Sequence, residues 1–463
     1  MNLRLSRVRS LQFAGCLGTV ILRNLRQAAQ GTRAAGHRTA DKPSEGRVRY
    51  SALELLKQGL SGNKGWPLLW RSPAPKPAYD ALIIGGGGHG LATAYYLARN
   101  HGMTNVAVLE KGYLGSGNIG RNTTIVRANY LLAGNSEFYS HSLKLWEGME
   151  TDLNFNAMHS QRGIINLFHS DGQRDAFARR GNAMINQGDD AILLDREGVR
   201  REVPYLDFDQ TRYPIYGGLW HKRGGTARHD AVAWGYARGA DQRGVDLIQN
   251  CEVTGFLIEN GSVQGVQTTR GEIRAPKVGM VVAGRSGQVA EMAGFRLPIE
   301  SHILQAFVTE GLKPCIDQVI TYGMGHFYIS QSDKGGLVFG GDLDFYASYA
   351  QRGNLPMAEH VVEAGMTLMP MIGKAKMLRS WGGIMDMTPD GSPIIDHSPV
   401  QGLYVNGGWC YGGFKAVPAS GWCMAHLMAT DTVHEIARRY RLDRFRTGHL
   451  IDEEATGSQH NLH

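Results

Sequence analysis

The stretch YDALIIGGGGHGLATAYYLA at residues 79–98 decides the fold of this chain. Residues 79–84 form a short apolar run, which is typical of a buried parallel strand. The glycine-rich segment GGGGHG follows, and residues 91–99 continue with the composition of a helix. A second apolar run at 106–109 ends in Glu110. The order of strand, helix and strand predicts one βαβ unit.

The glycine-rich segment satisfies the GxGxxG pattern of dinucleotide-binding proteins. In that pattern Gly85 permits a tight turn, Gly87 lets the backbone approach a diphosphate, and Gly90 allows close packing of helix on strand. The first helical amides and the positive end of the helix dipole favour phosphate binding. Glu110 is placed to bind a ribose hydroxyl, which suits NAD and FAD equally. The loop residues predicted to contact the cofactor are Gly85, Gly86, Gly87, Gly88, His89 and Gly90.

Composition and charge exclude several classes of protein. The 463 residues are 42% hydrophobic and 20% charged, which is ordinary for a globular protein and long enough for two interleaved domains. Residues 1–47 hold nine of the 49 Lys and Arg residues and two of the 42 Asp and Glu residues, which leaves 40 of each sign elsewhere. Because the remainder is neutral, the net charge of +7 does not indicate nucleic-acid binding.

The cysteines and the apolar runs exclude further features. Five scattered cysteines without a CxxC pair favour neither a disulfide framework nor a zinc site, so we expect no metal and a reducing compartment. No apolar run approaches the roughly 20 residues of a membrane-spanning helix, so we expect no membrane partner. Residues 1–46 are poor in acids and rich in Arg and Ala, which resembles a transit peptide. A secretory signal is a weaker alternative, and we favour a translation start near Val48.

A second glycine-rich region lies at 402–413, after the motif TPDGSPII at 388–395 and before Phe414 and Lys415. Two such regions are expected when one elongated FAD is held at both ends. With them the chain resembles the D-amino-acid oxidase and sarcosine oxidase group of flavoproteins. The resemblance implies a mixed α/β fold of the D-amino-acid oxidase/glutathione-reductase-2 type, in which a Rossmann-like FAD-binding domain is interleaved with a β-sheet substrate domain.

The predicted organisation follows this fold class. A basic extension and a Pro/Trp-rich arm precede three FAD-binding segments that alternate with two substrate-domain segments, and a short tail ends the chain. The extension covers 1–46, the arm 47–78 and the tail 441–463. The FAD-binding segments are 79–160, 212–300 and 371–440, and the substrate-domain segments are 161–211 and 301–370.

Longer segments resemble one branch of the group, the beta subunits of heterotetrameric sarcosine oxidases, over about residues 49–455. They include GRNTTIVRANY at 120–130, GGTARHDAVAWGYARGAD at 224–241 and LRSWGGI at 378–384. The resemblance implies that a noncovalent FAD oxidises sarcosine to glycine and passes electrons to a covalent FMN, which reduces dioxygen to hydrogen peroxide. It also implies alpha, gamma and delta partner subunits, with tetrahydrofolate acting through the alpha subunit to give methylenetetrahydrofolate in place of formaldehyde. The expected location is the bacterial cytoplasm, or the mitochondrion if the source is eukaryotic and the extension is a transit peptide.

The resemblance also assigns site residues. From its position before an amphipathic helix, His229 is expected to be a cap or surface residue. By the resemblance, however, it matches the histidine that carries FMN. Arg127 and Lys415 match positions that bind the substrate carboxylate, where Arg offers a bidentate fork and Lys a point charge. Tyr328 is a weaker candidate for lining the substrate pocket, against ordinary core packing. Further FAD contacts are predicted at Lys111, Asn118, Arg121, Asn122, Thr123, Thr124, Val253, Gly284, Gly412, Gly413, Phe414 and Lys415.

One departure and two alternatives stay open. The chain reads Gly408-Trp-Cys-Tyr411 where the relatives often have GWGT, so a bulky Tyr411 could alter the amine that is accepted. A second possible function is a flavin dehydrogenase for another secondary amine or an opine. A third, of a different class, is a flavin-binding scaffold without turnover, although a scaffold has no need for both Arg127 and Lys415.

Overall fold

A computed structural model describes residues 52–64 and 68–451 of the chain. The predicted extension at 1–46, with its transit-peptide and later-start interpretations, lies outside these residues, as does most of the predicted tail. The chain divides into two compact units, Met1–Leu56 and Lys57–His463. Within the described residues the first unit contributes the start of helix α2 (Ala52–Leu60). The description below concerns the second unit.

A six-stranded sheet forms around the predicted βαβ unit. Five of its strands are parallel, and the edge strand β18 runs antiparallel to β19. In the βαβ unit Ala81 pairs with Val106 and Ile84 with Leu109, so the carboxyl ends of β1 and β2 lie side by side. The strands, in sheet order, are β18 (Ile394–His397), β19 (Leu403–Gly407), β12 (Val278–Met280), β1 (Ala81–Ile84), β2 (Val106–Leu109) and β8 (Asp246–Ile248).

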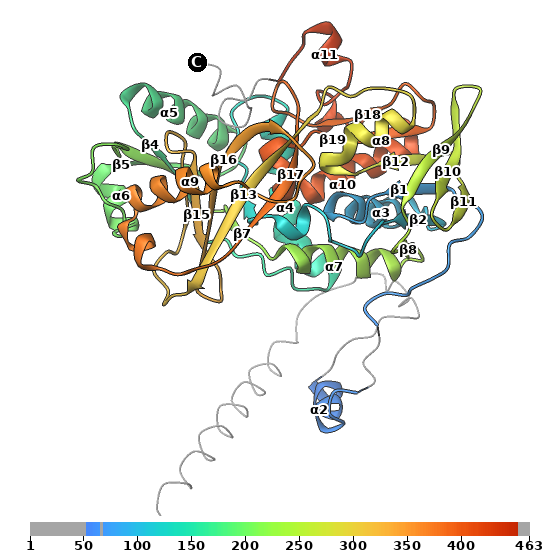
Figure 1. The fold of residues 1–463 in the computed structure, drawn as a ribbon, viewed down its shortest axis with the longest axis horizontal. Helices are drawn as coiled ribbons and strands as arrows, with labels where there is room; N and C mark the ends of the chain where they lie inside the picture. Colours follow the sequence, from blue (N-terminus) through green and yellow to red (C-terminus); the bar gives the residue numbers. More distant parts are fainter. Residues whose placement is uncertain (1–51, 65–67, 452–463) are drawn as a thin grey trace, which may run out of the picture. The chain divides into compact units, whose positions relative to one another are not determined.

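Both faces of this sheet are covered, which explains why every residue of β1 is buried. Ala81 and Ile83 face a helical layer, and Leu82 and Ile84 face a small antiparallel sheet and helix α8. The helical layer consists of α3 (Gly88–His101), α4 (Asn135–Leu153), α7 (His229–Asp241) and α10 (Gly413–Thr430). The other layer consists of β9 (Val253–Glu259), β10 (Ser262–Thr268), β11 (Gly271–Arg274) and α8 (Ser286–Met292), and β9–β11 stand at the right of Figure 1.

An eight-stranded sheet forms the second part of the fold, on the left of Figure 1 with α5 (Asp171–Asn186), α6 (Arg196–Glu202) and α9 (Leu355–Leu368). Its core contains the stacked rings of Phe307 and Phe339, with centroids 5.3 Å apart. The strands, in sheet order, are β17 (Met377–Met387), β13 (Glu300–Gly311), β16 (Gly336–Ala347), β15 (Phe327–Gln331), β14 (Val319–Tyr322), β4 (Ile164–Phe168), β6 (Gly217–His221) and β5 (Ile192–Asp195).

The two sheets alternate along the chain, so the predicted mixed α/β class with an interleaved second domain is confirmed. Strands β6 and β17 lie in the eight-stranded sheet, although the boundaries 212–300 and 371–440 group their residues with FAD-binding segments. The exact segment boundaries stay a prediction. Within the described ranges no helix combines the length and the apolar character needed to cross a bilayer.

Single elements follow the sequence closely, with one clear exception. Apolar residues at helical spacing predict a helix from Asn135 to about Leu153, and the structure has α4 there. The dipeptide Asn260-Gly261 predicts a hairpin turn, and it joins β9 to β10. The sequence after the glycine-rich region predicts a final helix from about Pro418. That start is wrong, because α10 begins at Gly413 and contains Pro418. A proline inside a helix costs about 3 kcal/mol. Most of α10 is buried, and its packing on α3 and α4 outweighs that cost.

Candidate active site

The loop between β1 and α3 requires glycine at two positions. Gly85 has φ +113°, and a Cβ there would lie 2.2 Å from the carbonyl oxygen of Val281. A Cβ on Gly90 would lie 2.0 Å from the carbonyl oxygen of Gly85, because α3 packs tightly on the loop. Gly87, the N-cap of α3, differs from both, since a Cβ there would meet no protein atom within 4 Å. The loop therefore leaves open space directly in front of the first amides of α3.

Glu110 braces this loop from the end of β2. Its Oε2 accepts a hydrogen bond from the Gly86 amide at 2.9 Å, and its Oε1 accepts one from the Gly112 amide at 2.8 Å. The Glu110 carbonyl accepts from the Cys251 amide at 2.9 Å, which brings the segment leading to the buried Val253 against the same strand end. Lys111, which follows Glu110 and is a predicted FAD contact, is exposed. Glu110 thus borders the loop, and its predicted ribose contact stays a prediction, as do the predicted FAD contacts of Lys111 and Val253.

His89 joins the first glycine-rich region to the second. Its ring stacks on Trp409 with centroids 4.6 Å apart, and its Nδ1 lies 2.6 Å from the Ser420 hydroxyl. Burial lowers the pKa of His89 to about 3, so the ring is neutral. A Cβ on Gly413 would lie 3.7 Å from His89 Nε2. The two regions that the sequence predicted to hold one cofactor are therefore in contact.

The turn that precedes α10 is also closely packed. A Cβ on Gly412 would lie 2.0 Å from the hydroxyl oxygen of Tyr139, and Phe414 is buried against Trp146 with centroids 5.4 Å apart. Gly408 at the start of the turn has φ +72°, and its amide donates to the Asp386 carboxyl at 2.6 Å. Burial raises the pKa of Asp386 to about 6. The sequence reasoning missed Asp386, although an acid within the apolar run GIMDM was a signal.

The segment 118–124 fixes the predicted cofactor residues between the two sheets. The Asn118 side chain donates to the Ile384 carbonyl and accepts from the Ile384 amide at 3.1 Å. A Cβ on Gly284 would lie 2.4 Å from the same carbonyl oxygen, so Gly284 also packs against Ile384. The Arg121 guanidinium donates to the carbonyls of Ser116 and, at 2.8 Å, Gly117.

Backbone strain marks the end of that segment. Thr124 has φ +69°, a conformation that a β-branched residue rarely adopts. Its amide donates to the Asn122 side chain at 2.7 Å, which holds the residue in place. Thr123 next to it forms a side-chain hydrogen bond with the half-buried Tyr328, and desolvation raises the pKa of Tyr328 to about 12. Strain of this kind concentrates at functional sites, which agrees with the predicted role of residues 122–124.

Two cationic side chains meet beside these residues. Lys415 lies in the first turn of α10, and its Nζ donates to the Tyr411 carbonyl at 2.8 Å. Burial, and then the nearby charge of Arg127, holds the pKa of Lys415 well below its usual value. The Arg127 guanidinium lies over the Tyr130 ring at 4.7 Å. In the described residues neither Arg127 nor Lys415 forms an ion pair with a carboxylate, an arrangement that suits an anionic ligand.

Arg127 is oriented from the eight-stranded sheet. Its guanidinium donates to the side-chain oxygen of Asn129 at 2.7 Å, and the side-chain nitrogen of Asn129 donates to the side-chain oxygen of Asn166 at 2.6 Å. Asn166 in turn donates to the Thr321 hydroxyl on the neighbouring strand β14. The sequence reasoning missed these asparagines, although Asn129 stands two residues after Arg127 in the quoted motif.

His229 is the first residue of α7, and its surroundings differ from those of an ordinary cap. Its Nδ1 is buried and makes no hydrogen bond within the described part of the chain. Burial is the largest cause that lowers the pKa of His229, so its imidazole is neutral. The neighbouring Arg228 and Asp230 pair with each other at 2.8 Å. A neutral imidazole with an unused buried nitrogen fits a residue that forms a covalent bond there.

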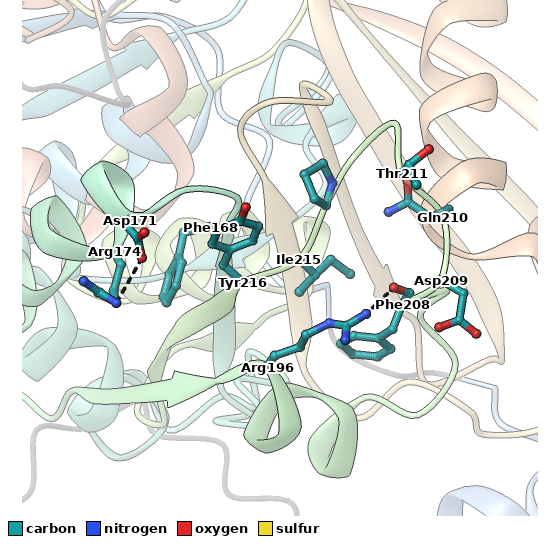
Figure 2. A pocket seen from close by; sticks show the side chains of 11 residues that line it. Phe168, Asp171, Arg174, Arg196, Phe208, Asp209, Gln210, Thr211, Ile215 and Tyr216 are labelled. Atoms are coloured by element: carbon teal, nitrogen blue, oxygen red, sulfur yellow. Dashed lines mark hydrogen bonds and ion pairs between the residues drawn. The ribbon is translucent and has the colours of Figure 1, made fainter.

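A separate cleft of about 620 Å³ lies in the eight-stranded part. Figure 2 shows Arg196 directed toward Phe208, to whose carbonyl it donates, and Arg174 paired with Asp171. None of the predicted site residues lines this cleft. The described residues also contain no group of three or more His, Cys, Asp or Glu side chains placed to hold a metal ion.

Comparison with known proteins agrees with this arrangement. Residues 80–427 match the family described as FAD dependent oxidoreductase. The sarcosine oxidase subunit beta of Rhizobium meliloti is 67% identical over 90% of this chain and 100% of its own length, and that of an Arthrobacter species is 49% identical over 84% and 96%. L-proline dehydrogenase from P. horikoshii superposes with a TM-score of 0.76 at 27% identity, covering 81% of this chain and 99% of its own. The chain therefore belongs to the FAD dependent oxidoreductase family and, within it, to the group of the sarcosine oxidase beta subunits.

Proposed function

We propose that this chain is the subunit of a sarcosine oxidase that binds FAD and oxidises sarcosine, or a closely related N-methyl amino acid, to its demethylated product. The observation that carries the proposal is the meeting of Arg127 and Lys415 without a carboxylate partner in the described residues. An amino-acid carboxylate supplies the missing anion. The names of the relatives at 67% and 49% identity support the same substrate.

The chain's own residues position the substrate and the cofactor. The Arg127 fork and the Lys415 ammonium bind the carboxylate and thereby fix the N-methyl end of the substrate. The amides of residues 87–90, Glu110 and the turn at 412–415 hold FAD. Bound FAD supplies an acceptor for the hydride of the methyl carbon. The resulting imine is hydrolysed to glycine and formaldehyde.

His229 is the proposed attachment point of a covalent FMN. Its neutral imidazole with an unused buried Nδ1 supports this assignment. Bound FMN would supply a carrier that passes electrons to dioxygen and so forms hydrogen peroxide. The subunit names of the relatives support a multi-subunit complex, for which we propose alpha, gamma and delta partners and a tetrahydrofolate-binding alpha subunit.

A second candidate is a dehydrogenase of another secondary amine that passes electrons to a carrier. The superposition with an L-proline dehydrogenase favours it, because proline is also a secondary amine with a carboxylate. A scaffold without turnover has no comparable support, since it would leave the half-buried Arg127 and the buried Lys415 without a ligand.

Anaerobic mixing of the flavin-loaded protein with sarcosine or L-proline separates these functions. Sarcosine is expected to bleach the flavin absorbance, and air is expected to restore it with release of hydrogen peroxide. Faster bleaching by proline, with no reoxidation by air, would favour the dehydrogenase instead. Denatured wild type is expected to keep a yellow chromophore of the mass of FMN on the His229 peptide, while His229→Ala releases all flavin.

A further inference from the structure

The side-chain hydrogen bonds that lead from Arg127 into the eight-stranded sheet can run in one direction only. A guanidinium carries N–H donors and no acceptor, so Asn129 must turn its amide oxygen toward Arg127. The amide nitrogen of Asn129 then faces the side-chain oxygen of Asn166 at 2.6 Å. Asn166 donates in turn from its own nitrogen to the Thr321 hydroxyl. Both amides therefore have a single orientation, which the arginine determines.

The eight-stranded sheet fixes the positions of these groups. Asn166 of β4 and Thr321 of β14 are direct partners in the parallel register of the two strands. A second bond from the same sheet reaches the residue after Arg127, because the Ala128 amide donates to Nε2 of His221 on β6 at 3.4 Å. Strands β4 and β6 are neighbours in the sheet. The segment that carries Arg127 is thus held by two adjacent strands.

The Arg127 guanidinium is held at one edge and on one face without losing its charge. Asn129 accepts from it at 2.7 Å, and the centroid of the Tyr130 ring lies 4.7 Å from its central carbon. Asn129 and Tyr130 are both buried. An amide and an aromatic ring carry no formal charge, so neither contact neutralises the cation. An arginine oriented in this way keeps its positive charge and further N–H donors for a carboxylate.

We propose that Asn129, Asn166 and Thr321 are positioning residues that direct the Arg127 guanidinium toward the substrate carboxylate; this rests on the proposed function. The amide at position 129 is the decisive group. A carboxylate there would have nearly the same shape, but it would form an ion pair with Arg127 and compete with the substrate. It would also lack the N–H group that Asn166 accepts, so two oxygen acceptors would face each other.

The first test is Asn129→Asp, which changes the charge and removes a donor but keeps the shape. The dissociation constant of acetate, measured by perturbation of the flavin spectrum, should rise about 10-fold to 100-fold, because a charge-assisted hydrogen bond to the ligand is lost. In anaerobic reduction of the flavin by sarcosine, the rise should appear mainly in the sarcosine dissociation constant and less in the limiting rate. The affinity for FAD should stay unchanged.

Asn135→Asp is the matched control for this variant. Asn135 is also a buried asparagine whose amide is bonded at both ends, to the Tyr440 hydroxyl at 2.8 Å and to the Ser392 hydroxyl at 3.2 Å. The same substitution there places a carboxylate in a buried amide site without a bond to Arg127. Asn135→Asp should therefore bind acetate as tightly as wild type.

Thr321 provides a second pair of variants, at the far end of the chain of hydrogen bonds. Thr321→Val keeps nearly the same volume and removes the hydroxyl, whereas Thr321→Ser keeps the hydroxyl. Without this acceptor the Asn166 amide is no longer held in one orientation. Loss of one neutral hydrogen bond should weaken acetate binding about 2-fold to 12-fold in Thr321→Val, and Thr321→Ser should bind like wild type. This pair decides the proposal if Asn129→Asp does not fold.

The outcomes separate the positioning role from the proposed function. Acetate and sarcosine affinities of Asn129→Asp and Thr321→Val that equal those of wild type would overturn the positioning role and leave the proposed function intact. An equal loss of acetate affinity in Asn135→Asp or in Thr321→Ser would also overturn it, because the effect would then be a general loosening of the fold. A wild-type flavin that sarcosine does not reduce would refute the proposed function instead.

Discussion

Gly87 offers a direct test of whether the loop at the start of α3 holds a diphosphate. Alanine at this position finds no protein atom within 4 Å of its Cβ, and the backbone angles of φ −83° and ψ −177° suit any residue. The stability of the flavin-free protein should therefore change by less than about 1 kcal/mol. If a diphosphate occupies the open space, the added methyl group collides with it. Overpacking costs about 1 to 3 kcal/mol, which corresponds to an FAD affinity about 5-fold to 150-fold weaker.

Titration of the flavin-free protein with FAD, followed by the quenching of flavin fluorescence, measures this affinity. Urea unfolding of the same sample gives the free energy of unfolding. Gly172→Ala is the matched control, because Gly172 also lies in the first turn of a helix and its Cβ would also meet nothing within 4 Å. It should leave FAD binding unchanged. Wild-type FAD affinity in Gly87→Ala would mean that the cofactor does not approach this backbone.

The further predictions concern two buried ionisable groups, Lys415 and Asp386. Lys415→Met should weaken acetate binding about 10-fold to 100-fold, measured by perturbation of the flavin spectrum, because a charge-assisted hydrogen bond is lost. Because the folded-state pKa of Lys415 is lowered, the unfolded chain binds more protons at pH values between the folded-state and the unfolded-state pKa of this lysine. The free energy of unfolding of wild type should therefore rise with pH across this range. Urea unfolding of Lys415→Met should lack this rise. The pKa of Asp386 is raised to about 6, so the folded state binds more protons and wild-type stability should fall between about pH 4 and pH 6. The fall is at most about 3 kcal/mol, and unfolding of Asp386→Asn at the two pH values should show a smaller difference.

The sequence predicts those parts of the fold in which local pattern and tertiary structure agree. The strand before Gly85 and the helix that begins at Asn135 are found where the pattern placed them. The start of α10 was not predictable from Pro418, because burial of the helix outweighs the local cost of proline. The membership of β17 in the eight-stranded sheet depends on long-range pairing with β13, which no local pattern encodes.

The candidate site divides in the same way. Motifs name the glycines, Arg127 and Lys415, and the structure brings the two cations together. Asp386 carries no motif, since its environment is created by segments distant in sequence. Its burial is therefore visible in the folded chain and not in the sequence.

The stacking of His89 on Trp409 has a consequence for how the protein is made. A chain leaves the ribosome from its amino end, so the phosphate loop emerges long before the turn that closes over it. Strands β12 and β19, which complete the parallel sheet beside β1, are also translated late. FAD must therefore bind after nearly the whole polypeptide has been synthesised. A nascent chain that ends before Lys415 is released without bound flavin.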